Sequence, residues 1–199
     1  MNEIVKYHNH MNEISFRKFN SVELDLFFSI CYQMKEKKSD IIQLSFSEIK
    51  QIAKLKMNYT IEDFSKILKS MYKKLIGLSF SLEDEKEYLE FVLFTKYQIN
   101  KEHQFISIKI NDEFSYILND LTANFTRFEL EEYTKLRSSY SKQMFKLLAQ
   151  FKSTGVLIVL MNDFKQKLDI PNSYKMHHID KFVLKPILTE LPSYFKNLK

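Results

Sequence analysis

The sequence has very little glycine, proline and cysteine, and each shortage excludes a class of protein. Two glycines and three prolines among 199 residues exclude collagen-like, low-complexity and linker-rich chains. Phosphate-binding loops and dinucleotide fingerprints need clustered glycines, whereas Gly77 and Gly155 are isolated. The single cysteine, Cys31, excludes a disulfide framework and a cysteine-rich zinc site, and it is typical of a reducing cytoplasm.

Long apolar runs are also missing. No run approaches the roughly 18 residues that a membrane span requires, and residues 1–6 lack the apolar core of a signal peptide. What is present is an ordinary globular balance of 45% hydrophobic and 28% charged residues. We therefore expect a cytoplasmic protein that has no membrane partner.

The net charge of +5 is unevenly distributed. Residues 1–124 contain 17 Lys and Arg against 18 Asp and Glu, whereas residues 125–199 contain 13 against 7. The basic excess is therefore confined to the last third of the chain. It agrees with two domains, 1–124 and 125–199, of which the second carries the positive charge.

The first domain shows the element order of a winged helix. Helices are expected where Ser21, Ser47 and Thr60 can cap apolar-periodic runs, and Gly77 lies where the third helix should end. Two extended runs joined by the acidic turn 83–87 predict a hairpin, which would be the wing. The expected elements are helix 22–34, strand 41–46, helices 48–54 and 61–76, strands 78–82, 88–99 and 105–110, and helix 113–121.

The pattern then recurs. Ser47, Tyr59 and Phe64 correspond to Asn162, Tyr174 and Ile179, each 115 residues later, which predicts an internal duplication. Only seven residues follow Pro192, too few for a second hairpin. We expect an α+β fold of two tandem winged-helix domains, the second lacking most of its wing. Its expected elements are helices 128–136 and 139–151, strand 156–161, helix 163–168 capped by Asn162, and helix 176–191.

The last of these helices is the best candidate for DNA recognition. Such a helix buries one face and presents polar side chains to base edges and phosphates. Ile179, Phe182, Val183 and Ile187 are expected to face inward. A solvated charged face is the alternative interpretation. The outward candidates for DNA contact are Lys175, His177, His178, Lys181 and Lys185.

Two further basic segments are candidates. At the start of helix 139–151, hydroxyls, backbone N–H groups and positive charge could anchor a phosphate, although plain helix capping explains the serines equally well. On helix 61–76 the lysines could touch DNA, but Glu62 and Asp63 make a solvated face or a protein interface about as plausible. The candidates are Arg137, Ser138, Ser139, Tyr140 and Lys142, and Lys66, Lys69 and Lys73.

No residue pattern predicts catalysis or metal binding. His8-Asn9-His10 differs from the His-hydrophobic-His motif of rolling-circle nickases because Asn9 is polar. His177 and His178 are adjacent, so they cannot share one helix face as metal ligands would. We expect a protein that is not an enzyme, with no metal, no cofactor and no small-molecule substrate.

With the duplicated helix-turn-helix established, the whole chain resembles the plasmid theta-type replication initiator (Rep) proteins that bind iterons. The resemblance implies a DNA-binding initiator that binds direct repeats at the plasmid origin, promotes origin opening and loads the host helicase. The alternative is a transcriptional repressor that binds an inverted repeat as a dimer. The resemblance is carried by residues 7–12, 19–30, 91–97, 125–130, 136–142, 168–171 and 180–187.

The family resemblance also implies partners and a division of labour. Expected partners are double-stranded DNA, a second copy of the chain in a monomer–dimer equilibrium, and the host initiator and helicase. The first domain would supply dimerisation and accessory DNA contacts, and the second would be the main reader of the repeat.

Overall fold

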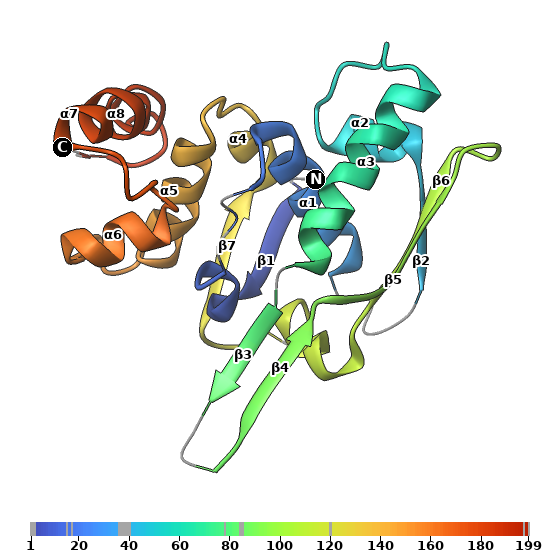
Figure 1. Ribbon diagram of the computed structural model, residues 1–199, viewed down its shortest axis with the longest axis horizontal. Helices are drawn as coiled ribbons and strands as arrows, with labels where there is room; N and C mark the ends of the chain where they lie inside the picture. The colour runs from blue at the N-terminus through green and yellow to red at the C-terminus, as the bar shows by residue number, and fades with distance from the viewer. Residues whose placement is uncertain are drawn as a thin grey trace.

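The computed structural model describes residues 3–14, 16, 18–35, 41–77, 79–83, 86–119, 121–196 and 198. It is a mixed structure of helices and antiparallel strands (Figure 1). The expected α+β class with two winged-helix units is confirmed, with a complete first unit and a second unit in which no strand follows the last helix among the described residues.

The first unit consists of three helices and a three-stranded sheet. The sheet has the order β2-β6-β5, and Ile42 and Leu44 of β2 lie opposite Ile108 and Ile106 of β6. Apolar side chains on these strands are buried against the helices, as an amphipathic antiparallel sheet requires. The elements are α1 (Ser21–Met34), β2 (Ile42–Ser45), α2 (Phe46–Ile52), α3 (Ile61–Ile76), β5 (Phe94–Asn100) and β6 (Phe105–Ile110).

The wing is not the hairpin predicted from the sequence. The run 88–99 is divided at Leu93 into β4 (Tyr88–Val92), which pairs with β3 (Ser79–Glu83), and β5, which pairs with β6. Leu93 is buried and its carbonyl accepts a 2.8 Å hydrogen bond from the N–H of Asn111, which holds the chain where it changes sheet. The wing is therefore β5–β6 with the turn 101–104. The acidic hairpin β3–β4 projects separately from the body (Figure 1).

In the first unit, two of the three predicted caps lie one or two residues away from the predicted position. Asn20, not Ser21, caps α1, and Ser45, not Ser47, caps α2; each forms a capping box with the glutamate three residues later. Thr60 caps α3 as predicted, since its side chain accepts a hydrogen bond from the N–H of Asp63. Gly77 is the C-cap of α3, also as predicted.

A second small sheet connects the N-terminal segment to the middle of the chain. Val5 and Tyr7 of β1 lie opposite Phe128 and Thr126 of β7. The helix predicted over 128–136 is correspondingly shorter, because its first residues belong to β7, and the helix predicted over 113–121 is a shorter 3-10 helix. The elements are β1 (Ile4–His8), η1 (Asn9–Asn12), η2 (Asp112–Ile117), β7 (Phe125–Glu129) and α4 (Leu130–Thr134).

The second unit repeats the helix-turn-helix of the first. Its two helices begin 115 residues after α2 and α3 (46 to 161, 61 to 176). The turns correspond in detail: Lys54 and Asp169 have φ values of +52° and +55° at equivalent positions. The elements are α5 (Ser139–Gln150), α6 (Met161–Lys167) and one continuous helix formed by α7 (Met176–Ile179), the π-helical turn η3 (Asp180–Leu184) and α8 (Lys185–Glu190).

The start of the second unit differs from the prediction. Asn162 lies inside α6, whose N-cap is Leu160 without a side-chain hydrogen bond. The expected strand 156–161 is not formed, because no strand among the described residues pairs with it. Its apolar side chains are consequently open to solvent, with Ile158 91% exposed.

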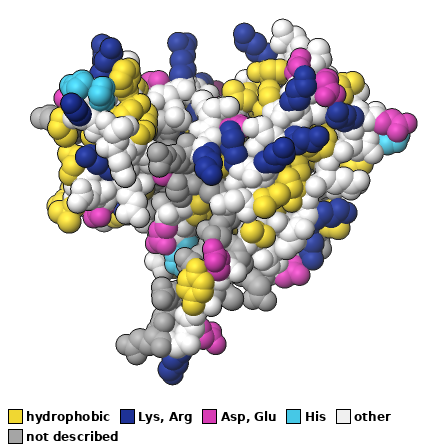
Figure 2. Space-filling view, in the orientation of Figure 1, with side chains coloured by type: hydrophobic (Ala, Val, Ile, Leu, Met, Phe, Trp, Pro, Cys, Tyr) yellow, Lys and Arg dark blue, Asp and Glu magenta, His cyan; other side chains and the backbone are white. Residues whose placement is uncertain are grey.

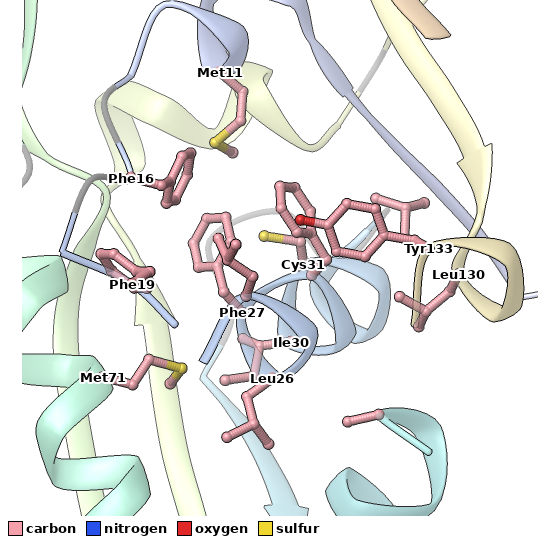
Figure 3. Packing of buried hydrophobic residues seen from close by; sticks show 14 of the residues in the cluster. Met11, Phe16, Phe19, Leu26, Phe27, Ile30, Cys31, Met71, Leu130 and Tyr133 are labelled. Carbon is pink, nitrogen blue, oxygen red and sulfur yellow. The ribbon is translucent and has the colours of Figure 1, made fainter. Parts of the chain in front are cut away.

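The core is rich in aromatic rings and lies where α1 meets the β1–β7 sheet, α4 and α5. Figure 3 shows Phe27 and Cys31 of α1 facing Phe16 and Tyr133. The ring centroids of Phe28 and Tyr133 are 5.0 Å apart in an edge-to-face arrangement, which adds to the burial energy. Cys31 is buried and packs as a core residue. This shared core fixes α5, and with it the second unit, against the first.

Candidate nucleic-acid interface

The continuous helix α7–η3–α8 buries one face and exposes a cationic one. Ile179, Val183 and Ile187 are 0–3% exposed and anchor the helix to the core. The structure therefore brings most of the predicted contact residues of this helix onto one open surface. Exposed on it are Lys175, His177, Lys181 and Lys185, whereas His178 is half-buried.

Phe182 departs from its predicted inward position. Its side chain is 43% exposed, and the Nζ atom of Lys181 lies 5.1 Å from the centre of its ring. The π-helical turn explains the difference, because its wider spacing alters the 3.6-residue period on which the prediction was based.

The start of α5 is held by a carboxylate of the same chain. The N–H of Arg137 donates to Glu190 Oε2 at 3.1 Å, and the N–H of Ser138 donates to both Glu190 oxygens at 3.3 Å. Ser138 is also the N-cap, since its Oγ accepts from the N–H of Ser141. Two of the backbone groups predicted to anchor phosphate are therefore already bonded. Glu190 was not predicted, and only its place in the last turn of α8 could have suggested the contact.

The side chains of this segment divide into accessible and inaccessible ones. Arg137 is exposed, and Ser139 and Tyr140 are half-buried. Lys142, predicted to contact DNA, is fully buried: its Nζ lies 2.5 Å from Asp25 Oδ1 and donates to the carbonyl of Tyr133 at 2.8 Å. This lysine is a core residue, and the prediction that it contacts DNA is corrected.

In the first unit the three predicted lysines of α3 are all exposed. Lys66, Lys69 and Lys73 lie along one side of the helix, and Lys66 Nζ is 3.4 Å from Asp63 Oδ1. Lys66 is the counterpart of Lys181, 115 residues earlier. Helices α3 and α7–η3–α8 therefore present an exposed lysine at the same position of their repeat.

The wing adds basic residues that the sequence did not assign to this surface. Lys101 at the wing turn forms a 2.8 Å ion pair with Glu62 at the start of α3, and Lys96 of β5 is exposed. Figure 2 shows lysine and arginine side chains along the upper edge of the molecule, over α7–α8 on the left and over α2–α3 on the right. Lys96 and Lys101 could have been predicted from the sequence if the wing had been placed at β5–β6.

The histidines near the N-terminus form an aromatic group. The ring centroids of His8 and His10 are 4.2 Å apart, and His10 Nδ1 lies 3.3 Å from the hydroxyl of Tyr116. Burial lowers the pKa of His8, and the neighbouring His10 lowers it further. Within the part of the chain that the structure describes, no three His, Cys, Asp or Glu side chains are grouped as a metal site would need. A search of the same residues finds no helix long and apolar enough to span a bilayer.

Comparison with known proteins agrees with this architecture. The family described as "Initiator Replication protein, WH1" matches residues 4–149, and "Initiator Rep protein, WH2" matches residues 160–198. A curated relative, "Probable replication protein rep" of Bifidobacterium longum (strain NCC 2705), is 32% identical over 191 residues, which are 95% of this chain. The chain spans 64% of that relative's length.

A solved structure shares the fold. The Pi initiator protein, crystallised in complex with iteron DNA, superposes with a TM-score of 0.73 at 15% sequence identity, over 96% of this chain and 86% of that one. The resemblance predicted from the sequence is confirmed by the family matches and by two winged-helix units in tandem. The chain belongs to the family of plasmid replication initiator (Rep) proteins.

Proposed function

We propose that the chain is a sequence-specific double-stranded DNA-binding initiator that binds direct repeats at a plasmid origin. The observation that carries the proposal is the duplicated helix-turn-helix, in which Lys66 and Lys181 occupy equivalent exposed positions. A protein with two recognition helices can read two successive stretches of major groove, about one helical turn of DNA apart.

Within this function the second unit is the main reader. Lys175, Lys181 and Lys185 supply positive charge to phosphates or guanine edges, and His177 can contribute to base readout. Arg137 is an exposed cation just before the start of α5, and it contacts the DNA backbone. The region 125–199 thus carries most of the specificity, and the region 1–124 supplies accessory contacts through Lys66, Lys69 and Lys73.

The finer steps follow from the family. We propose that bound copies help to open the neighbouring AT-rich DNA and to load the host helicase together with the host initiator. The first unit supplies the interface of a homodimer that exchanges with the monomer. The protein acts in the cytoplasm, without a cofactor and without forming a covalent bond to DNA.

A footprint on the plasmid that carries the gene tests the proposed function. Protection of tandem direct repeats beside an AT-rich segment supports an initiator. Protection confined to one inverted repeat at a promoter supports a repressor, and no protection at any salt concentration contradicts DNA reading. For variants of the lysines on α7–η3–α8, Lys152→Ala is the matched control. Lys152 is an exposed lysine just beyond the opposite end of α5 from Ser138.

A further inference from the structure

Phe182 is an exposed aromatic residue on a helix whose exposed charged side chains are Lys175, Lys181, Lys185 and one carboxylate, Asp180. Its side chain is 43% exposed, and that of Met176 at the start of the helix is 52% exposed. Figure 2 shows hydrophobic atoms directly beside the histidines at the upper left. The helix does not need this ring for its own packing, because Ile179 and Val183 are already fully buried.

The ring of Phe182 is held in a defined orientation. His178 lies nearly parallel to it, at 16° with centroids 6.2 Å apart, and the Tyr174 ring is 6.0 Å away. The Nζ atom of Lys181 lies 5.1 Å from the ring centre. An apolar surface held by ring contacts and a neighbouring cation loses little conformational freedom when it binds, which favours a specific contact.

Comparison with the first unit indicates that a wing of the second unit, packed as β5 is packed on α3, would not cover the ring of Phe182. There, β5 packs on α3 through Leu68, whose carbonyl accepts from the Tyr97 hydroxyl, and through Tyr72, whose ring stacks on Tyr97 at 4.1 Å. The residues 115 positions later are Val183 and Ile187. A strand placed on the second helix in the same way would cover Val183 and Ile187. The counterpart of Phe182 is Ile67, which is half-buried against the core, whereas the two contacts that join α3 to Tyr97 of β5 are made by Leu68 and Tyr72.

The charged side chains near the Phe182 ring indicate which class of molecule binds there. Three exposed cations, Lys175, Lys181 and Lys185, outnumber the one exposed carboxylate near the ring, Asp180, and a rim of net positive charge suits a polyanion better than an apolar protein. In the major groove of DNA the apolar group that projects from the base edges is the C5-methyl of thymine. We propose that Phe182 contacts thymine methyl groups in the major groove and is a specificity-determining residue of the site; this inference rests on the proposed function.

Replacing thymine by uracil in the DNA tests this directly, because it removes the methyl group and nothing else. A duplex carrying the direct repeats of the plasmid is made by polymerase chain reaction with dTTP or with dUTP. Binding of both duplexes by the wild-type protein and by Phe182→Ala is measured by fluorescence anisotropy. We expect the wild type to bind the thymine duplex about threefold to fourfold more tightly for each methyl contacted, and the ratio to fall close to one in Phe182→Ala.

Two controls make the outcome decisive. Phe182→Leu keeps an apolar side chain and should retain part of the preference, whereas Ile76→Ala, a change at an exposed isoleucine of α3, should leave it unchanged. Wild-type binding with equal affinity for both duplexes overturns the role of Phe182 but leaves the proposed function standing. An unchanged thymine preference in Phe182→Ala overturns it as well. Failure of the wild type to bind either duplex overturns both.

Discussion

Lys142 of α5 and Asp25 of α1 form a buried ion pair with 2.5 Å between Nζ and Oδ1, and the same ammonium group donates to the carbonyl of Tyr133. Helices α1, α4 and α5 therefore meet at one charged group, and Asp25 lies more than 100 residues before the other two residues in the sequence. Because both side chains are removed from water, the pair constrains how α5 packs on α1.

Removing one member of this pair should be strongly destabilising. Lys142→Met leaves the Asp25 carboxylate buried without its partner, and we expect a loss of about 3–5 kcal/mol in the free energy of unfolding, measured by urea denaturation. The double variant Asp25→Leu/Lys142→Met should recover part of the loss. A change below about 0.5 kcal/mol, the size expected at an exposed position such as Lys152, would contradict the importance of the pair.

Lys146 should make stability depend on pH in the neutral to alkaline range. Its side chain is 2% exposed and lies over the Phe16 ring at 4.3 Å, and burial lowers its pKa from 10.5 to about 7, although Asp169 and Cys31 oppose that shift. Between these two values the unfolded chain holds a proton that the folded chain has lost, so this lysine makes stability rise with pH. Below about pH 7 the lysine is protonated in both the folded and the unfolded chain, so its destabilising effect has reached its maximum.

The variant Lys146→Met isolates this effect. Its free energy of unfolding should exceed that of the wild type most at or below pH 7, and the difference should shrink as the pH approaches 10.5. The fall in pKa limits the pH-dependent part to about 5 kcal/mol. Urea denaturation of both proteins at several pH values gives the difference, and a difference that stays constant across this range would contradict the account.

Glu190 should stabilise the junction of α5 and α8. Its carboxylate accepts hydrogen bonds from the N–H groups of Arg137 and Ser138. Glu190→Ala should cost about 0.5–2 kcal/mol, the range measured for lost helix caps, whereas Glu190→Gln retains one acceptor and should cost less. Thermal denaturation compares the two variants. Equal stability of Glu190→Ala and wild type would show that water replaces the carboxylate without loss.

The segment before α6 should promote self-association. Val156, Ile158 and Leu160 are 60%, 91% and 75% exposed, whereas the corresponding strand of the first unit, β2, is paired with β6. The segment is not a strand in this structure, but an exposed apolar stretch of this kind pairs readily with the strand edge of another molecule. Ile158→Lys should shift sedimentation profiles at high concentration toward the monomer, whereas Ile76→Lys should not. Identical profiles for Ile158→Lys and wild type would contradict this.

Sequence patterns were most informative where the signal is local. Helical periodicity and a constant offset of 115 residues predicted both helix-turn-helix units, because amphipathic helices and their turns depend on neighbouring residues. The caps were misplaced by one or two positions, since Asn20 and Ser21, or Ser45 and Ser47, offer similar side-chain oxygens. Only the backbone conformation decides which residue caps the helix.

The remaining differences between the sequence-based predictions and the structure come from contacts between residues that are far apart in the sequence. β1 and β7 pair across more than 100 positions, and neither segment contains a sequence pattern that identifies the strand with which it pairs. Lys142 cannot be distinguished from an exposed lysine by its neighbours, because Asp25, 117 residues away, determines its burial. Phe182 turns outward through a π-helical turn that a regular period does not anticipate.

The central proposal is that the helix α7–η3–α8 reads the DNA. The most direct test is the affinity for a direct-repeat duplex from the plasmid, against a scrambled duplex of equal length, for the wild type, Lys181→Ala, Lys185→Ala and the control Lys152→Ala. We expect the wild type to prefer the repeat, each change on the helix to cost about 1–3 kcal/mol on the repeat if it removes a base contact, and Lys152→Ala to be neutral. Unchanged affinity of both helix variants, or equal wild-type binding to the two duplexes, would show that this helix does not read the repeat.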